Sequence, residues 1–124
     1  MARSFYNISF TQDPSAVDNL VRSILIGDDY HEINYNTEVV WKKGTGLMTA
    51  MHYIKLEYYP NVLRVAGWVQ VGVGSIGGKE RDLTGFTCAI PKQSVKKTIE
   101  KIQLAVAQMA SIPYGNPNTP NMPR

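Results

Sequence analysis

The chain contains few side chains of the types that carry out catalysis. It has two histidines, His31 and His52, and a single cysteine, Cys88. A cysteine and a histidine act as nucleophile and base when a third group orients the histidine, and no such group is evident for His52. The competing interpretation is that Cys88 is a buried and unreactive small hydrophobe. We expect a protein that is not an enzyme, and keep an enzyme with a reactive Cys88 in a small pocket between sheet and helices as a third hypothesis.

Three glycines, Gly72, Gly74 and Gly77, match the dinucleotide-binding pattern G-x-G-x-x-G. This pattern binds a pyrophosphate where the glycines lead from a strand into a helix, whose amino end holds the phosphates. In this chain the glycines lead towards another expected strand instead. The favoured interpretation of residues 72–82 is a hairpin loop, and a nest of backbone amides that binds a phosphate is the alternative.

The remaining residue types predict neither a metal nor a cofactor. A single cysteine excludes an internal disulfide and a Cys-x-x-Cys zinc site. Three acidic residues form no recognisable carboxylate pair: Glu57, Glu80 and Asp82.

Lysines provide the candidate contacts for an anion. The net charge of +3 permits an acidic partner, and the distribution of the charges decides whether one binds. Lys97 and Lys101 share a face of the expected last helix, while Lys42 and Lys43 lie at the tip of an expected hairpin. These four lysines are the predicted contacts for phosphates, although a basic helix face is more often only solvated.

The elements that would position these side chains follow from the hydrophobic pattern. Two runs with the strand period of two flank a turn at residues 42–46, which indicates a hairpin. Asp13 and Pro14 favour the start of a helix that Gly27 ends, and Ser94 is the expected cap of a second helix. The expected strands are 4–10, 33–41, 48–58, 62–71 and 83–90, and the expected helices are 14–27 and 94–109.

This order predicts an α+β fold, with a four- to five-stranded antiparallel sheet and two helices on one face. The β-α-β-β-β-β-α order is similar to that of the TATA-binding-protein-like folds. We expect one domain at residues 1–111 and a disordered tail, rich in proline and asparagine, at residues 112–124.

The length and composition fit one ordinary soluble domain. A chain of 124 residues with 44% hydrophobic residues buries enough surface to fold without a metal or a disulfide. No signal peptide is evident, and no apolar run approaches the ~20 residues of a membrane helix. We therefore expect a cytoplasmic protein that does not contact a membrane.

The second face of the sheet, opposite the helices, is unusually apolar. A wet sheet face normally carries polar residues, and an apolar patch there usually marks a partner or ligand surface. The alternatives are a register shifted by one residue, or a cover formed by the tail or by residues 72–82. The residues expected on this face are Val40, Met51, Tyr53, Tyr59, Val62 and Trp68.

The leading hypothesis is therefore a non-catalytic binding or assembly domain, which forms a homo-oligomer or binds a protein partner through Met51, Tyr53, Tyr59 and Trp68. The alternative is a module that binds a nucleic acid or an anionic ligand, with sheet aromatics stacked on bases and lysines on phosphates.

Several strings also carry a family resemblance. Residues 38–50, Gly67-Trp68 and residues 83–86 resemble small uncharacterised domains of Gram-positive bacteria, which often lie behind a zinc ribbon. The resemblance covers about residues 30–105 and implies a stand-alone bacterial domain. Because the chain has one cysteine, the ribbon is absent here. The resemblance implies no catalytic residues.

Overall fold

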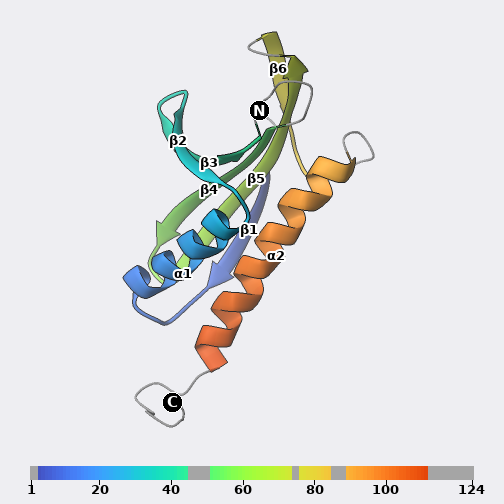
Figure 1. The fold of residues 1–124 in the computed structure, drawn as a ribbon. Coiled ribbons are helices and arrows are strands. Elements are labelled where there is room, and N and C mark those ends of the chain that lie inside the picture. The colour runs from blue at the N-terminus through green and yellow to red at the C-terminus, as the bar shows by residue number, and fades with distance from the viewer. Residues whose placement is uncertain (1–2, 45–50, 74–75, 85–88, 112–124) are drawn as a thin grey trace.

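The fold is an antiparallel sheet with two helices on one face (Figure 1). It is taken from a computed structural model, which describes residues 3–44, 51–73, 76–84 and 89–111. The predicted α+β class is confirmed. The elements are β1 (Ser4–Ser9), α1 (Pro14–Gly27), β2 (His31–Tyr35), β3 (Glu38–Lys43), β4 (Met51–Tyr59), β5 (Val62–Val73), β6 (Ile76–Arg81) and α2 (Ala89–Ser111).

Strand β5 is the longest strand of the sheet and pairs with three others, β1, β4 and β6. Five strands lie in the order β1-β5-β4-β3-β2, and β6 pairs with the part of β5 that β1 leaves open. β1 is antiparallel to residues 62–67 of β5, while β6 pairs from Val69 onwards. All neighbouring strands are antiparallel.

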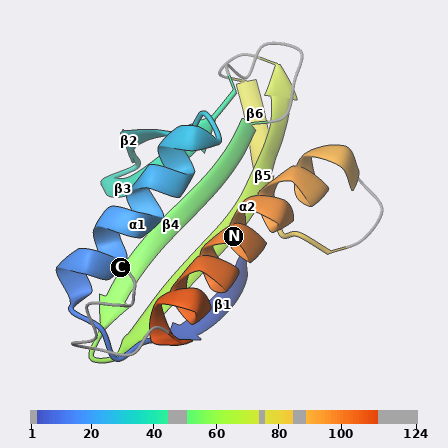
Figure 2. The same cartoon turned by 60° about the horizontal axis from the view of Figure 1, so that its bottom comes forward.

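The main core lies between the sheet and the two helices, which cover the same face (Figure 2). Apolar residues recur at helical spacing along α1 and α2, so each helix has one apolar side that packs on the strands. Alternate residues of the strands supply the other half of this core. Its fully buried members include Val17, Val21 and Leu25 of α1, Val95, Ile99, Ile102 and Val106 of α2, and Ile54, Leu63, Val65 and Val69 of the sheet.

The expected single strand at residues 33–41 is wrong, because the chain reverses inside it. Asn36 and Thr37 have positive φ values of 48° and 69°, the backbone conformation that a two-residue hairpin turn requires. Asn adopts this conformation readily, but a β-branched threonine rarely does, so the local sequence gives a weak turn signal. The result is the β2–β3 hairpin.

The prediction of a loop at residues 72–82 is also wrong for the residues of this range that the structure describes. Residues 76–81 form β6, which continues the sheet beside β5. Gly72 and Gly77 of the G-x-G-x-x-G match therefore lie in two paired strands, and Gly74 is outside the described residues. A strand pair does not supply the helix amino end that dinucleotide binding requires.

The expected strand at residues 83–90 and the helix start at Ser94 need correction. Leu83 and Thr84 are not in a strand, and α2 begins at Ala89, so Pro91 lies in its first turn. Proline is tolerated there because the first amides of a helix have no partner within it. Residues 85–88, Cys88 included, and the tail at residues 112–124 are outside the described residues. The domain boundary at residue 111 stays a prediction.

Helix α1 begins as expected after Asp13, with Pro14 in its first turn, although the Asp13 side chain makes no capping hydrogen bond. Its end differs from the expectation. Gly27 is the last helical residue, and Asp29 takes the left-handed position with φ 68°. The amide of Tyr30 donates to the carbonyl of Leu25, and the amide of Asp29 donates to that of Ile26. These two bonds form a Schellman motif, in which Leu25 and Tyr30 are both buried.

Candidate functional site

The second face of the sheet carries a stacked aromatic cluster. Tyr53 and Trp68 occupy opposite positions on β4 and β5, and their rings are stacked with centroids 5.2 Å apart. Tyr35 of β2 adds a third ring, 4.8 Å from Tyr53 and 6.1 Å from Trp68. Three strand spacings separate β2 from β5, about 14 Å in a flat sheet. The sheet must therefore curl so that the β2–β3 hairpin reaches over its second face (Figure 1).

An ion network closes this cluster. The Arg3 guanidinium lies 3.7 Å from the centre of the Trp68 ring and forms an ion pair of 2.9 Å with Glu38. The Lys55 ammonium lies 2.7 Å from the same carboxylate. Hydrogen bonds from Arg3 and Lys55 lower the pKa of Glu38 to about 2. Glu38 therefore joins the hairpin to β4 and to Arg3, the residue just before β1.

Three of the four residues predicted as the partner surface are consequently buried. Met51, Tyr53 and Trp68 are 8%, 2% and 0% exposed, and only Tyr59 is exposed, at 48%. A partner would have to displace the β2–β3 hairpin before it could contact them. Self-association or protein binding through this face stays a prediction, and the burial of these side chains does not favour it.

The helix side of the sheet holds a second arrangement, a pocket of about 430 Å³ lined by three lysines. We call it the lysine pocket. It lies where the end of α1, the end of β3 and the first turns of α2 meet. Its lining residues are Asp28, Lys43, Ile90, Gln93, Ser94, Lys97, Thr98 and Lys101.

The Schellman motif places Asp28 in this pocket. Since Leu25 and Tyr30 are anchored in the core on either side of it, the Asp28 carboxylate is directed at α2. It accepts a hydrogen bond of 2.6 Å from Thr98 Oγ1 and one of 2.7 Å from Lys101 Nζ. Asp28 is thus a fixed negative charge that ties α1 to α2.

Strand alternation places Lys43, and not Lys42, in the lysine pocket. Trp41 belongs to the core under the helices, so Lys43, two residues further, lies on the same side of β3. Its ammonium is 5.8 Å from the Tyr30 ring centre. Lys42 pairs with Tyr53 on β4, which belongs to the second-face cluster. Of the four predicted anion contacts, the structure therefore brings together Lys43, Lys97 and Lys101.

Helical spacing supplies the rest of the lysine pocket. Residues three and four apart share a helix face. Ile90, Gln93, Ser94, Lys97, Thr98 and Lys101 follow this spacing along the first turns of α2.

The electrostatics of the lysine pocket favour an anion. Burial alone would raise the pKa of Asp28, but its hydrogen bonds from Lys101 and Thr98 and the charges of Lys101 and Lys43 outweigh that effect and lower the pKa. Among the described residues, neither Lys43 nor Lys97 forms an ion pair with a carboxylate. Two of the three ammonium groups are therefore available to a ligand.

His52 lies beside the lysine pocket, opposite Lys43 in the β3–β4 pairing. Its Nδ1 atom is buried without a hydrogen-bond partner. Burial, together with the positive charge of Lys43, lowers the pKa of His52, so the imidazole is neutral at pH 7. The proposed pairing of His52 with Cys88 falls outside the described residues.

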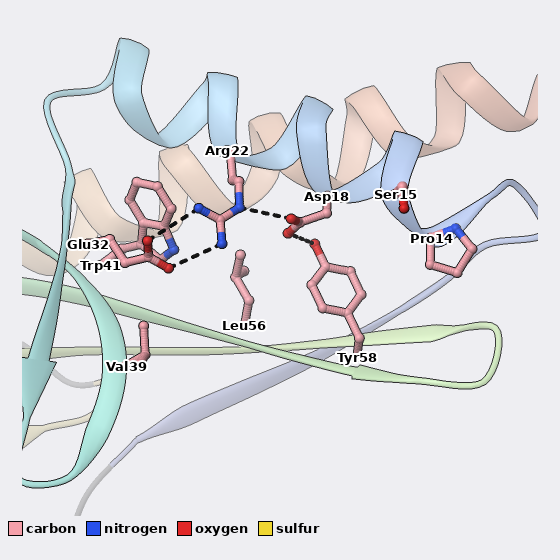
Figure 3. Close-up of a pocket in the computed structure, with 9 residues that line it drawn as sticks. All are labelled: Pro14, Ser15, Asp18, Arg22, Glu32, Val39, Trp41, Leu56 and Tyr58. Carbon is pink, nitrogen blue, oxygen red and sulfur yellow. Dashed lines mark hydrogen bonds and ion pairs between the residues drawn. The ribbon is translucent and has the colours of Figure 1, made fainter.

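Sequence reasoning missed a third arrangement, a pocket of about 410 Å³ between α1 and strands β2 to β4. In Figure 3 the Arg22 guanidinium lies between two carboxylates, 2.8 Å from Asp18 and 3.2 Å from Glu32. The Tyr58 hydroxyl donates a hydrogen bond of 2.8 Å to Asp18. The spacing of Asp18 and Arg22 was a usable signal, since residues four apart on a helix pair readily. Among the described residues that line this pocket, the cation is Arg22, and it is already paired twice, so none of them offers a free cation to an anionic ligand.

No group of three or more metal-ligating side chains occurs among the residues that the structure describes. In the same part of the chain, no helix is both long and apolar enough to cross a membrane. No protein-family model, curated protein or solved structure matches this chain. The resemblance to domains of Gram-positive bacteria therefore stays a prediction.

Proposed function

We propose that the protein is a non-catalytic binding module whose ligand carries an anionic group, held by Lys43, Lys97 and Lys101. The observation that carries this proposal is the convergence of these lysines, from β3 and from two turns of α2, on one pocket. Lys43 lies far from Lys97 and Lys101 in the sequence, so the fold and not a local run of charge brings it to the two lysines of α2. Like charges repel when no counter-charge is present, and a bound anion would relieve that repulsion.

The lysine pocket is open to solvent, so its affinity for a simple anion is expected to be modest. Interactions between exposed charges contribute little each and weaken with salt. We expect a dissociation constant on the order of 1 mM for inorganic phosphate at low ionic strength, and weaker binding in high salt.

Titration with inorganic phosphate, followed by amide NMR shifts, tests this proposal. Lys43 and Lys97 each have an adjacent lysine, Lys42 and Lys96, that does not line the lysine pocket, which gives matched controls of equal charge change. We expect Lys43→Ala and Lys97→Ala to weaken phosphate binding about tenfold. Lys42→Ala and Lys96→Ala should weaken it less than about twofold, because they change only the long-range field.

Two results would contradict the proposal. The first is an absence of phosphate-dependent shifts around the lysine pocket in the unaltered protein. The second is an equal loss of affinity in all four variants, which would mean that phosphate responds only to net charge.

A further inference from the structure

The proposed function leaves open which anion the lysine pocket takes. We infer that its ligand is a small phosphate monoester with an apolar group, and not a nucleic-acid strand. This inference rests on the proposed function and adds the charge, the size and the second chemical group of the ligand.

The charge of the lysine pocket matches a dianion. Three ammonium groups and the Asp28 carboxylate leave a net charge of +2. A phosphate monoester carries close to two negative charges above its second pKa of about 6, whereas a carboxylate, a sulfate ester or a backbone phosphodiester carries one. The monoester is the ligand group that neutralises the lysine pocket.

The lysines are not arranged for a strand of nucleic acid. Single strands bind along a basic groove in which aromatic side chains stack on successive bases. The stacked aromatics of this protein, Tyr53 and Trp68, are buried on the opposite side of the sheet from the lysine pocket. Asp28 would also repel a backbone that passed beside Lys101. One nucleic-acid strand therefore cannot place its phosphates on the lysines and stack its bases on these aromatic rings at the same time.

The mouth of the lysine pocket provides the apolar contact. Ile90 is 85% exposed, so its side chain is not part of the core under α2. It lies in the first turn of α2 and shares a helix face with Ser94 and Lys97. The aliphatic stems of the lysines add apolar surface below their charged ends. A ligand held at its phosphate can thus rest an apolar group on Ile90.

The start of α2 supports the same orientation. The first amides of a helix lack partners within the helix and carry a positive partial charge. Ile90 belongs to this first turn and lines the lysine pocket, so the positive end of the helix lies on the same side as the lysines. This contribution adds to the lysine pocket and does not define it.

Asp28 would then set the preference for charge. Its carboxylate shares Lys101 with any ligand, so a monoanion gains little and a dianion gains more. The substitution Asp28→Asn should raise the affinity for phosphate about threefold to tenfold, because one repulsive charge is lost and Lys101 is released. This change opposes the effect of the lysine variants.

Three probes separate the features of the ligand. Phenyl phosphate carries both the dianion and the apolar group, phenyl sulfate keeps the ring with a single charge, and inorganic phosphate lacks the ring. At pH 8 and low salt we expect phenyl phosphate to bind about fivefold more tightly than either of the others. A twelve-residue oligothymidylate is the nucleic-acid probe.

A matched pair of variants tests the apolar contact. Ile90→Ser should abolish the preference for phenyl phosphate over inorganic phosphate. Leu104→Ser is the control, since Leu104 is also exposed on α2, at 65%, but does not line the lysine pocket. Both variants replace an exposed side chain, so neither is expected to unfold the protein.

Each outcome decides a different point. If inorganic phosphate binds but phenyl phosphate binds no better, or Ile90→Ser behaves like Leu104→Ser, the inference is overturned and the proposed function remains. If the oligothymidylate displaces phenyl phosphate at a lower concentration than inorganic phosphate does, the ligand is a nucleic acid and the inference is overturned. If no phosphate compound shifts the amides of the lysine pocket, the proposed function fails first.

Discussion

Gly67 offers the sharpest test of how α2 is seated on the sheet. This residue lies in β5, at the point where α2 crosses that strand. A Cβ atom at this position would come within 2.8 Å of Ile99 Cδ1, 3.0 Å of Leu83 Cδ1 and 3.1 Å of Val95 Cγ1. These three neighbours are buried, so none of them can move out into solvent.

The expected cost follows from these distances. One contact is below any normal approach of a Cβ atom and two are tight, so Gly67→Ala forces the Ile99 side chain to shift and crowds Leu83 and Val95. Overpacking of this kind destabilises a core by about 1–3 kcal/mol, which exceeds the gain of up to ~1 kcal/mol that alanine brings by restricting the unfolded chain. We expect a net loss of about 1–2 kcal/mol in the free energy of unfolding.

Urea unfolding, followed by tryptophan fluorescence, measures this loss. Gly27→Ala is the matched control, because Gly27 has helical geometry and no atom within 4 Å of the added Cβ. It should raise the free energy of unfolding by about 0.4–1 kcal/mol. Since Ser94 and Thr98 adjoin the displaced residues of α2, Gly67→Ala should also weaken phosphate binding in the lysine pocket.

The reasoning would be refuted if Gly67→Ala proved as stable as Gly27→Ala. That result would mean that α2 lies further from β5 than the structure places it. A loss of stability in both variants would instead show that alanine is unfavourable at each position for reasons unrelated to the crossing point.

Two further predictions concern charge and backbone conformation. The pKa of Glu38 is lowered from 4.5 to about 2 in the folded protein, so its stabilising contribution is complete above pH 4.5 and disappears as the pH falls to 2. The stability difference between the unaltered protein and Glu38→Gln should therefore be about 1–2 kcal/mol at pH 6 and near zero at pH 2, and a constant difference would contradict the network. Asp29→Gly should raise the free energy of unfolding by about 0.5–1 kcal/mol, because glycine adopts φ 68° without steric cost. Asp29→Ala is its control and should lower stability, and an equal effect of both would argue against the Schellman motif.

The sequence was sufficient to predict which aromatic residues of β4 and β5 face away from the helices. Alternation alone placed Tyr53 and Trp68 on the side opposite the helices, as the strand register confirms. This works because a strand exposes alternate residues to opposite faces, whatever its neighbours are. The period is a local property, so it can be read without knowing the tertiary structure.

What the sequence did not predict depends on contacts between distant residues. The burial of Tyr53 and Trp68 depends on a hairpin that closes at Asn36 and Thr37, whose turn signal is weak. Once this turn is missed, the cover over the second face is missed with it. An apolar sheet face therefore does not by itself establish a partner surface.

The lysine pocket was predictable in part. Helical spacing grouped Lys97 with Lys101, but the choice of Lys43 over Lys42 required the observation that Trp41 is a core residue. The contact of Asp28 with Lys101 spans 73 positions in the sequence. No local pattern encodes such a distance, because it follows from the packing of α1 against α2.

The division of one edge of β5 between β1 and β6 also bears on aggregation. A twelve-residue strand that is rich in valine and has no proline is the kind of segment that recruits other chains through its unpaired amides and carbonyls. β1 covers one half of that edge and β6 covers the other. β1 precedes β5 in the chain and β6 follows it closely, so a chain still being synthesised can cover both halves soon after β5 emerges. The interval in which this strand can template an intermolecular sheet is thereby kept short.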